Sequence, residues 1–213
     1  MNFLSFNIRG IHGGAKASWI KSLRISNKIS IIALQETKVE SVSSACCASF
    51  WGKGNFESAC AASVGLSGGL AWIWDPAVIK IETVVRNRYY LILKGFIAGD
   101  GNPINLVNIY APQSTSAKLQ LWNDISAIMD PDVGFWVLAG DFNAVRSSEE
   151  RKNSSFKPVC AENFNNFIFS NGLLEYPLQG RKFTCIRDNG KKLSKLDRFL
   201  VSPDFLTNGR RLV

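Results

Sequence analysis

Two polar residues stand directly after an apolar run in the segment VLAGDFNAV, residues 137–145. The run predicts a buried strand, and Asp141 and Asn143 would point the same way if the extended chain continues past Gly140. A carboxylate and an amide placed together at a strand end cost desolvation free energy unless they bind something, which indicates a site. Gly-Asp and Asn are also ordinary turn residues, and for this stretch alone a polar turn is the slightly better interpretation.

Polar residues also lie at the ends of other apolar runs in the chain. They are Asn7 in SFNIRG, Glu36 in LQETK, Tyr110 in NIYAP and Asp197 in SKLDRFLVS. Each alone has a simpler explanation, as a turn, a solvated helix start or an amphipathic residue at a rim. Because strand ends in layered α/β sheets converge on a cleft, the five runs together favour one shared polar site.

These residue types suit a site for magnesium and phosphate. Mg²⁺ prefers oxygen ligands and keeps several waters, so one or two carboxylates and a substrate phosphate oxygen suffice. The carboxylates would be Glu36 and Asp141, and the groups that hold metal or phosphate would be Asn7, Asn143 and Tyr110. Phosphodiester hydrolysis also needs a base that activates water, typically a histidine held by a carboxylate. The only histidine, His12, lies in a glycine-flanked loop, and nothing in the sequence marks it as that base.

Strand and helix patterns along the chain must position this site. Strands are predicted at residues 2–7, 30–35, 70–74, 78–85, 89–97, 104–111, 135–140, 182–186 and 196–202. Helices are predicted at 116–129, at 161–172 and at 17–25, where Trp19, Ile20 and Leu23 form a face that packs on the core. Many strands with helices between them, and no repeat or linker, predict one layered α/β domain with mixed sheets over residues 1–213.

Composition excludes several classes of protein. The 213 residues are 46% hydrophobic and 20% charged, which suits one globular domain with a substantial core. No apolar run is long enough to span a bilayer and the first residues do not resemble a secretory signal, so we expect a soluble intracellular protein without a membrane partner. Five cysteines with no C-x-x-C pair support neither a disulfide framework nor a zinc site.

The formal net charge of +8 favours an anionic partner, such as nucleic acid or a phospholipid surface. Residues 181–198 contain seven basic residues and two acidic ones. A solvated hairpin would explain such a segment, but the polar residues around it favour phosphate contacts. We therefore predict that Lys195 and Arg198 contact DNA, which is compatible with a nuclear location.

The motifs quoted above, together with SGG before an aromatic strand, resemble those of the endonuclease/exonuclease/phosphatase superfamily. The resemblance is strongest to the apurinic-endonuclease-like endonuclease domain of non-LTR retrotransposons, notably those of plant genomes. The motifs occur in family order over nearly all of the chain. GDFNAV with LQETK is highly specific, NIYAP is moderately specific, and the glycine pair alone is weak.

The resemblance implies a four-layer αββα sandwich, with two mixed β-sheets flanked by helices and a metal cleft at one end. It implies that Glu36, Asn7 and Asp141 surround Mg²⁺, or Mn²⁺ as the alternative ion. It also implies roles in catalysis for Asp141, Asn143, Tyr110, Asn7 and Asp197, and a place on the DNA side of the cleft for Thr184 and Ser194. In the retrotransposon setting such a domain nicks one strand of target DNA and exposes a 3′-hydroxyl from which reverse transcription starts. Whether this domain was once fused to a reverse transcriptase cannot be read from the sequence.

Two departures from the family pattern modify these expectations. Arg9 replaces a second carboxylate of the repair enzymes, which favours the retrotransposon branch. Family members continue to a terminal Ser-Asp-His motif, whereas this sequence stops at Val213. We therefore expect a truncated sandwich that lacks its last strand and nicks DNA weakly, since losing the base costs ~10²–10⁴-fold in rate.

Two other functions remain open from the sequence. One is a catalytically dead nucleic-acid-binding relic, which would keep the basic segment and the carboxylates without turnover. The other is a phosphoinositide or sphingomyelin phosphodiesterase with the same metal core, which ranks third because no membrane-facing apolar loop or lipid anchor is evident. Target-site preference and oligomeric state cannot be read from the sequence.

Overall fold

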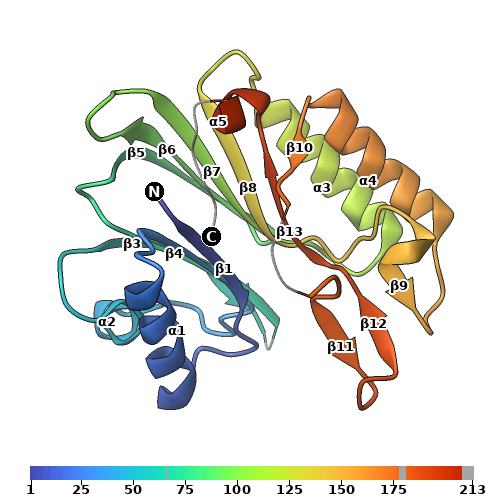
Figure 1. Ribbon diagram of the computed structural model, residues 1–213, viewed down its shortest axis with the longest axis horizontal. Helices are drawn as coiled ribbons and strands as arrows, with labels where there is room; N and C mark the ends of the chain where they lie inside the picture. Colours follow the sequence, from blue (N-terminus) through green and yellow to red (C-terminus); the bar gives the residue numbers. More distant parts are fainter. Residues whose placement is uncertain (66, 178–180, 208–213) are drawn as a thin grey trace.

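Two β-sheets lie face to face, and helices cover the outer face of each, in a computed structural model that describes residues 1–65, 67–177 and 181–207 (Figure 1). The four-stranded sheet has the order β1-β2-β4-β3, formed by Phe3–Asn7, Ile31–Gln35, Ser67–Trp74 and Glu57–Val64. The six-stranded sheet has the order β10-β13-β8-β7-β6-β5, formed by Leu174–Glu175, Asp197–Val201, Phe135–Asp141, Pro103–Tyr110, Tyr90–Ile97 and Ile79–Arg86.

Both sheets are mixed, because β1 pairs with β2 and β7 pairs with β8 in parallel while their other pairings are antiparallel. The helices α1 (Gly14–Ser26) and α2 (Ser44–Trp51) pack on the four-stranded sheet, and α3 (Thr115–Ile128) and α4 (Pro158–Ser170) pack on the six-stranded sheet. The predicted four-layer αββα sandwich is therefore confirmed. Within the described ranges, β1 pairs with no strand other than β2.

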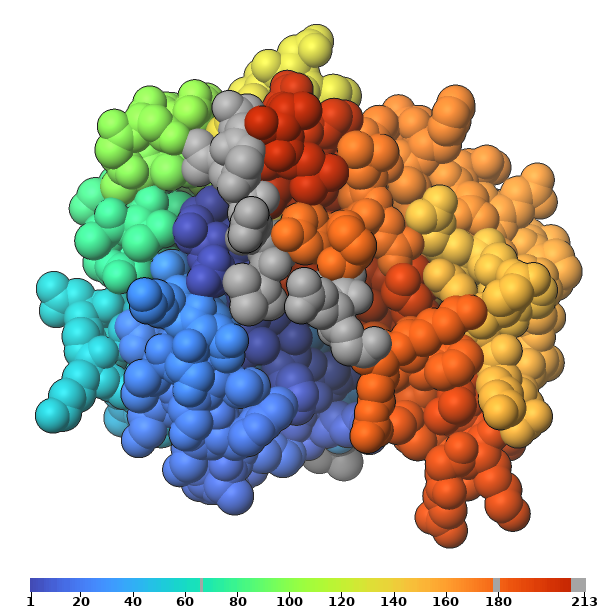
Figure 2. All heavy atoms as spheres, in the orientation of Figure 1, coloured from blue at the N-terminus to red at the C-terminus, as the bar shows by residue number. Residues whose placement is uncertain are grey.

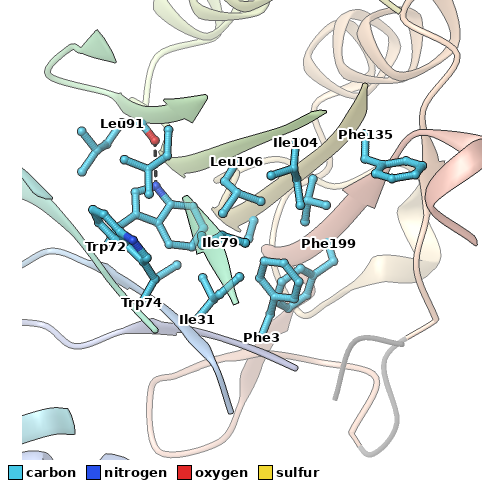
Figure 3. Packing of buried hydrophobic residues seen from close by; sticks show 14 of the residues in the cluster. Phe3, Ile31, Trp72, Trp74, Ile79, Leu91, Ile104, Leu106, Phe135 and Phe199 are labelled. Atoms are coloured by element: carbon cyan, nitrogen blue, oxygen red, sulfur yellow. Dashed lines mark hydrogen bonds between the residues drawn. The ribbon is translucent and has the colours of Figure 1, made fainter. Parts of the chain in front are cut away.

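The core between the sheets is built from apolar side chains that the two sheets direct toward each other. Figure 3 shows Trp72 and Ile31 of one sheet opposite Leu106 and Ile104 of the other. The indole of Trp72 is buried but not orphaned, because its Nε1 donates a hydrogen bond to the carbonyl of Leu91 at 2.9 Å. Burial of these side chains on both inner faces is the main force that holds the two sheets together.

A smaller sheet stands outside the sandwich. It contains β11 (Cys185–Arg187), β12 (Lys192–Ser194) and β9 (Arg151–Lys152). Strand β9 directly follows the 3₁₀-helix Ser148–Glu150. The β11–β12 hairpin, which contains much of the basic segment, projects from the rest of the surface (Figure 2). The chain then returns through β13 and ends its described part in the short helix α5 (Pro203–Thr207). No helix of the described part is long and apolar enough to cross a membrane.

Candidate active site

Strand register brings the predicted polar residues to one end of the sandwich. In the four-stranded sheet Asn7 pairs with Gln35, so Asn7 and the next residue, Glu36, leave the parallel strands β1 and β2 at the same edge. In the six-stranded sheet Asp141 is paired with Tyr110 on one side and with Asp197 on the other. The two sheets therefore present their polar ends to each other, although the strands that carry them are far apart in sequence.

Asn7 connects the two sheets at this end. Its Nδ2 donates hydrogen bonds to Glu36 Oε1 at 3.1 Å and to Asp141 Oδ2 at 3.0 Å. The hydroxyl of Tyr110 donates to the same Glu36 oxygen at 2.9 Å. Two carboxylates, an amide and a phenol thus form one contiguous polar cluster, as their positions at strand ends predict.

Two glycines allow the backbone to reach this arrangement. Gly140 has φ of 137°, and a Cβ atom there would lie 2.0 Å from the carbonyl oxygen of Ile109, so a side chain cannot be accommodated between β7 and β8. Gly69 has φ of 84°, and a Cβ atom would lie 2.2 Å from Thr37 Oγ1. The backbone of Thr37 donates to the carbonyl of Gly69 at 3.1 Å, so this close approach holds the loop next to Glu36. The glycines of GDFN and SGG are therefore steric requirements of the site.

Asn143 lies beside Asp141, but in a turn and not in a continued strand. Its φ is 47°, a left-handed conformation that Asn tolerates better than most residues. Its backbone N–H donates to Asp141 Oδ1 at 2.9 Å, and its side-chain amide donates to the carbonyl of Ala111 at 2.8 Å. The polar-turn interpretation is correct, and the turn itself orients the carboxylate of Asp141.

The electrostatics of the cluster are unfavourable for negative charge. Burial and then the negative charge of Asp197 raise the pKa of Asp141 to about 6, although hydrogen bonds from Asn143 and Asn7 oppose the shift. Burial also raises the pKa of Asp197, against the opposing effects of Thr184 and Arg9. These two facing carboxyls are desolvated like charges, an arrangement that is common at functional sites.

Tyr110 stays protonated in this environment. Burial raises its pKa, and the hydrogen bond to Glu36 and the charge of that carboxylate raise it further. The phenol is therefore a hydrogen-bond donor throughout the neutral range.

The cluster lines a cleft of about 780 Å³ whose wall also carries cations, among them Arg9, Lys16, Lys38 and Arg187. Lys16 Nζ donates to the carbonyl of Ile8 at 2.8 Å, and Lys38 Nζ lies 3.6 Å from Glu36 Oε2. Carboxylates and positive side chains thus share one concave surface. The chemistry that fits it is the binding of a phosphate group together with a cation.

Comparison with known proteins agrees with this chemistry. The chain matches the model of the endonuclease/exonuclease/phosphatase family over residues 4–213. It belongs to this family. The family predicted from the motifs is thereby confirmed, and membership supports a phosphodiesterase-type active site in the cleft.

Three proteins similar to the chain are a transposon protein and two nucleases of known structure. The Transposon TX1 uncharacterized 149 kDa protein of Xenopus laevis is 25% identical over 146 residues, and the match covers 64% of this chain but only 11% of that protein. An AP endonuclease from Archaeoglobus fulgidus has a TM-score of 0.73 with 19% identity, covering 96% of this chain and 88% of that chain. The endonuclease domain of TRAS1, a telomere-specific non-LTR retrotransposon, has a TM-score of 0.66 with 16% identity, covering 96% and 88%. At these identities the two structures show a shared fold.

The oxygen donors of this family member fit a divalent cation. Glu36 and Asp141 are linked by a single amide group, and the raised pKa of Asp141 reflects negative charge that the protein itself leaves uncompensated. Among the described residues, no three His, Cys, Asp or Glu side chains are close enough together to hold a metal ion. A hard cation that keeps several waters and takes further ligands from a substrate phosphate needs no more than the two carboxylates.

Thr184 lies on the cleft wall, as predicted, but its hydroxyl faces the protein backbone. Thr184 Oγ1 accepts hydrogen bonds from the N–H groups of Leu196 and Asp197, both at 3.0 Å. It therefore positions the start of β13, and with it Asp197. Ser194 lines a neighbouring cavity and not this cleft.

The prediction that Arg198 contacts DNA is wrong. Its guanidinium is buried, with a residue exposure of 1%, and it forms ion pairs with Glu150 and with Glu175, the latter at 2.6 Å. Lys195 also pairs with Glu175 at 2.6 Å, so its charge is neutralised within the protein. The cation for the cleft comes instead from Arg187 of the same basic segment.

Trp19 was also predicted wrongly, because it does not pack in the core. It is 49% exposed and lies edge-on to Phe6 at the cleft wall, with ring centroids 5.0 Å apart. Ile20 is buried as predicted, and Ala17 takes part in the buried face of α1 in place of Trp19. A helical pattern shows which residues share a face, but several neighbouring apolar positions can supply that face, and only packing decides which ones are buried.

Proposed function

We propose that this domain hydrolyses phosphodiester bonds in DNA with Mg²⁺, for which Mn²⁺ is the alternative ion, and that its product is a nick in one strand. The observation that carries the proposal is the Asn7 amide that joins Glu36 and Asp141 within a cleft walled by cations. A substrate whose phosphates follow one another along a strand can meet both the metal and the positive wall. DNA is therefore the proposed partner.

Each polar side chain has a role that follows from its contacts. Bound Mg²⁺ would be held by Glu36 and Asp141 with help from Asn7, and it would polarise a phosphoryl oxygen. Tyr110, which stays protonated, donates its O–H and can transfer that hydrogen bond from Glu36 to a phosphate oxygen. Asn7 can donate to the phosphate in the same way, because its amide already faces the cleft.

The base that activates water is the unusual part of the proposal. His12, the single histidine of the sequence, is exposed and does not line the cleft. We therefore expect nicking that is slower than with a histidine base, by up to ~10²–10⁴-fold.

The retrotransposon setting is proposed from the relatives. Both the TX1 transposon protein and the TRAS1 endonuclease domain belong to mobile elements. In that setting the nick would expose a 3′-hydroxyl from which a reverse transcriptase of the same polyprotein starts synthesis, and the protein would act in the nucleus. Because the chain spans 11% of the TX1 protein, the remaining activities of such a polyprotein are outside it.

The test is relaxation of supercoiled plasmid by purified protein in Mg²⁺. We expect nicked circles with wild type, none with Asp141→Ala, and none when a chelator removes the metal. Asp132→Ala is the matched control, because Asp132 is an exposed loop carboxylate outside the cleft and its loss should leave nicking unchanged. Absence of nicking by wild-type protein with native circular dichroism would contradict hydrolysis.

A binding protein without turnover is the second candidate, and it is favoured because the described residues of the cleft wall include no histidine. The two functions separate in one comparison. Binding of DNA that weakens with salt, measured without metal, together with no nicking in Mg²⁺, would support binding alone.

A further inference from the structure

A second cavity, of about 270 Å³, lies beside the active-site cleft. Its wall is built by the beginnings of α3 and α4, by the loop before α4 and by the β11–β12 hairpin. Gln113, Asn143, Cys185 and Arg187 line both the cleft and this cavity. A linear polymer bound in the cleft can therefore extend into the cavity while it stays in contact with the protein surface.

The cavity is positively charged. Five of its lining residues are cations, and no Asp or Glu belongs to the described wall; the cations are Lys118, Arg151, Lys157, Arg187 and Lys192. Two of them, Arg187 and Lys192, come from the basic hairpin that the sequence analysis assigned to phosphate contacts. This concentration of one sign of charge attracts an anion and raises its local concentration.

Lys118 is the deepest of these cations, with an exposure of 4%. Its Nζ donates to the carbonyl of Gln113 at 3.3 Å and to the sulfur of Cys160 at 3.5 Å, and it forms no ion pair with a carboxylate of the described residues. Burial lowers the pKa of Lys118, which measures how poorly its charge is compensated. Buried ammonium groups normally have an anionic partner, so the geometry indicates a missing one.

Polar groups of the cavity wall show the same deficit of acceptors. Helix α4 begins at this cavity with Lys157 at its N-cap, and the side chain of Lys157 makes no capping hydrogen bond to the first turn. A cation is electrostatically unfavourable at a helix N-terminus, where an anion is favoured. The Nε of Arg151 and the Oγ of Ser154 are also buried without a hydrogen-bond partner among the described residues.

We propose that this cavity binds a phosphate group of the DNA strand, next to the phosphate that is cleaved. The oxygens of a phosphodiester group can accept hydrogen bonds from Lys118 Nζ, Arg151 and Ser154 and from the N-terminus of α4. These bonds would give the unpaired donors of the cavity wall an acceptor. The proposal rests on the function proposed above, because it takes the strand in the cleft to be DNA. The cavity would position the DNA strand without selecting a sequence, because a contact with phosphate does not distinguish one base from another.

The test uses two variants that remove one cation each. Lys118→Met keeps the length of the buried side chain, and Lys157→Met changes an exposed residue. Lys80→Met is the matched control, because Lys80 is exposed on β5 at the opposite edge of the six-stranded sheet. Affinity for a fluorescein-labelled duplex is measured by anisotropy in chelator, over a series of salt concentrations.

We expect severalfold weaker binding for both cavity variants and a salt slope, d log K/d log[salt], smaller in magnitude by about 1 for each. Lys80→Met should keep the wild-type slope. Unchanged affinity and slope in both cavity variants would overturn the proposal. So would variants that weaken binding of inorganic phosphate, measured by calorimetry, but leave DNA binding unchanged. Failure of the proposed function shows separately, as absence of plasmid nicking by wild type.

Discussion

Replacement of Asp141 by Asn should stabilise the metal-free protein at neutral pH, although it removes a residue of the proposed active site. The carboxylate is 8% exposed and faces a second carboxylate, Asp197, across the β8–β13 pair. Asn has nearly the same shape and no charge. The comparison therefore isolates the cost of holding one negative charge in the cleft.

The magnitude follows from the shifted pKa. Burial and the facing Asp197 raise the pKa of Asp141 from 3.8 to about 6. Since one unit corresponds to about 1.36 kcal/mol, the ionised side chain costs the folded state about 3 kcal/mol relative to the unfolded chain. The folded state binds the proton more tightly, so the wild type keeps this stability below a pH of about 4 and loses it as pH rises through about 6. The Asn variant loses none of it.

The assay is urea unfolding in chelator at several pH values, followed by tryptophan fluorescence. The difference in unfolding free energy, variant minus wild type, should rise by about 3 kcal/mol between a pH of about 4 and a pH of about 8. Any constant effect of the new amide on hydrogen bonding cancels in this comparison. Asp132→Asn is the control, because an exposed carboxylate can be replaced with little change in stability. A difference that is the same at both ends of the pH range would refute the electrostatic account.

Three further predictions address the metal, the core and the cleft wall. Mg²⁺ should raise the melting temperature of wild type more at a pH of about 8 than at about 5, because Asp141 must lose its proton to bind the ion; thermal shift assays should show no such gain in Asp141→Asn. Arg198→Met should destabilise the protein by about 3–5 kcal/mol in urea unfolding, since it leaves Glu150 and Glu175 without their buried partner. Trp19→Ala should change stability by less than about 1 kcal/mol, because the ring is half exposed, but should raise the KM for plasmid DNA severalfold; an unchanged KM would remove Trp19 from the binding surface.

Two side-chain amides of the motifs, Asn108 and Gln35, support the site from within the core. The buried side chain of Asn108, on β7, accepts a hydrogen bond from Gln35 Nε2 at 2.6 Å and donates to the carbonyls of Leu34 and Ala71 at 3.1 and 3.0 Å. These bonds join the two sheets within the core. Asn108 was not singled out from the sequence, because a single amide in an apolar strand does not show which carbonyls it will meet.

The errors of the sequence analysis have a common cause. Arg198 was assigned to DNA because it stands in a basic segment, but its partners Glu150 and Glu175 are 48 and 23 residues away. Nothing in the sequence distinguishes Lys118 from the solvated lysines of an amphipathic helix. The pattern of charge along the chain does not show which side chains the fold buries.

What the sequence alone determined is local. Apolar alternation and runs predicted most strands and the helices α1, α3 and α4, because side chains repeat every two residues in a strand and about every 3.6 in a helix. The motifs also identified the family and the polar strand ends. Tertiary structure decided how these ends meet: the Asn7–Asp141 hydrogen bond joins residues 134 positions apart. That contact depends on strand register and on the packing of one sheet against the other, and these are properties of the whole core.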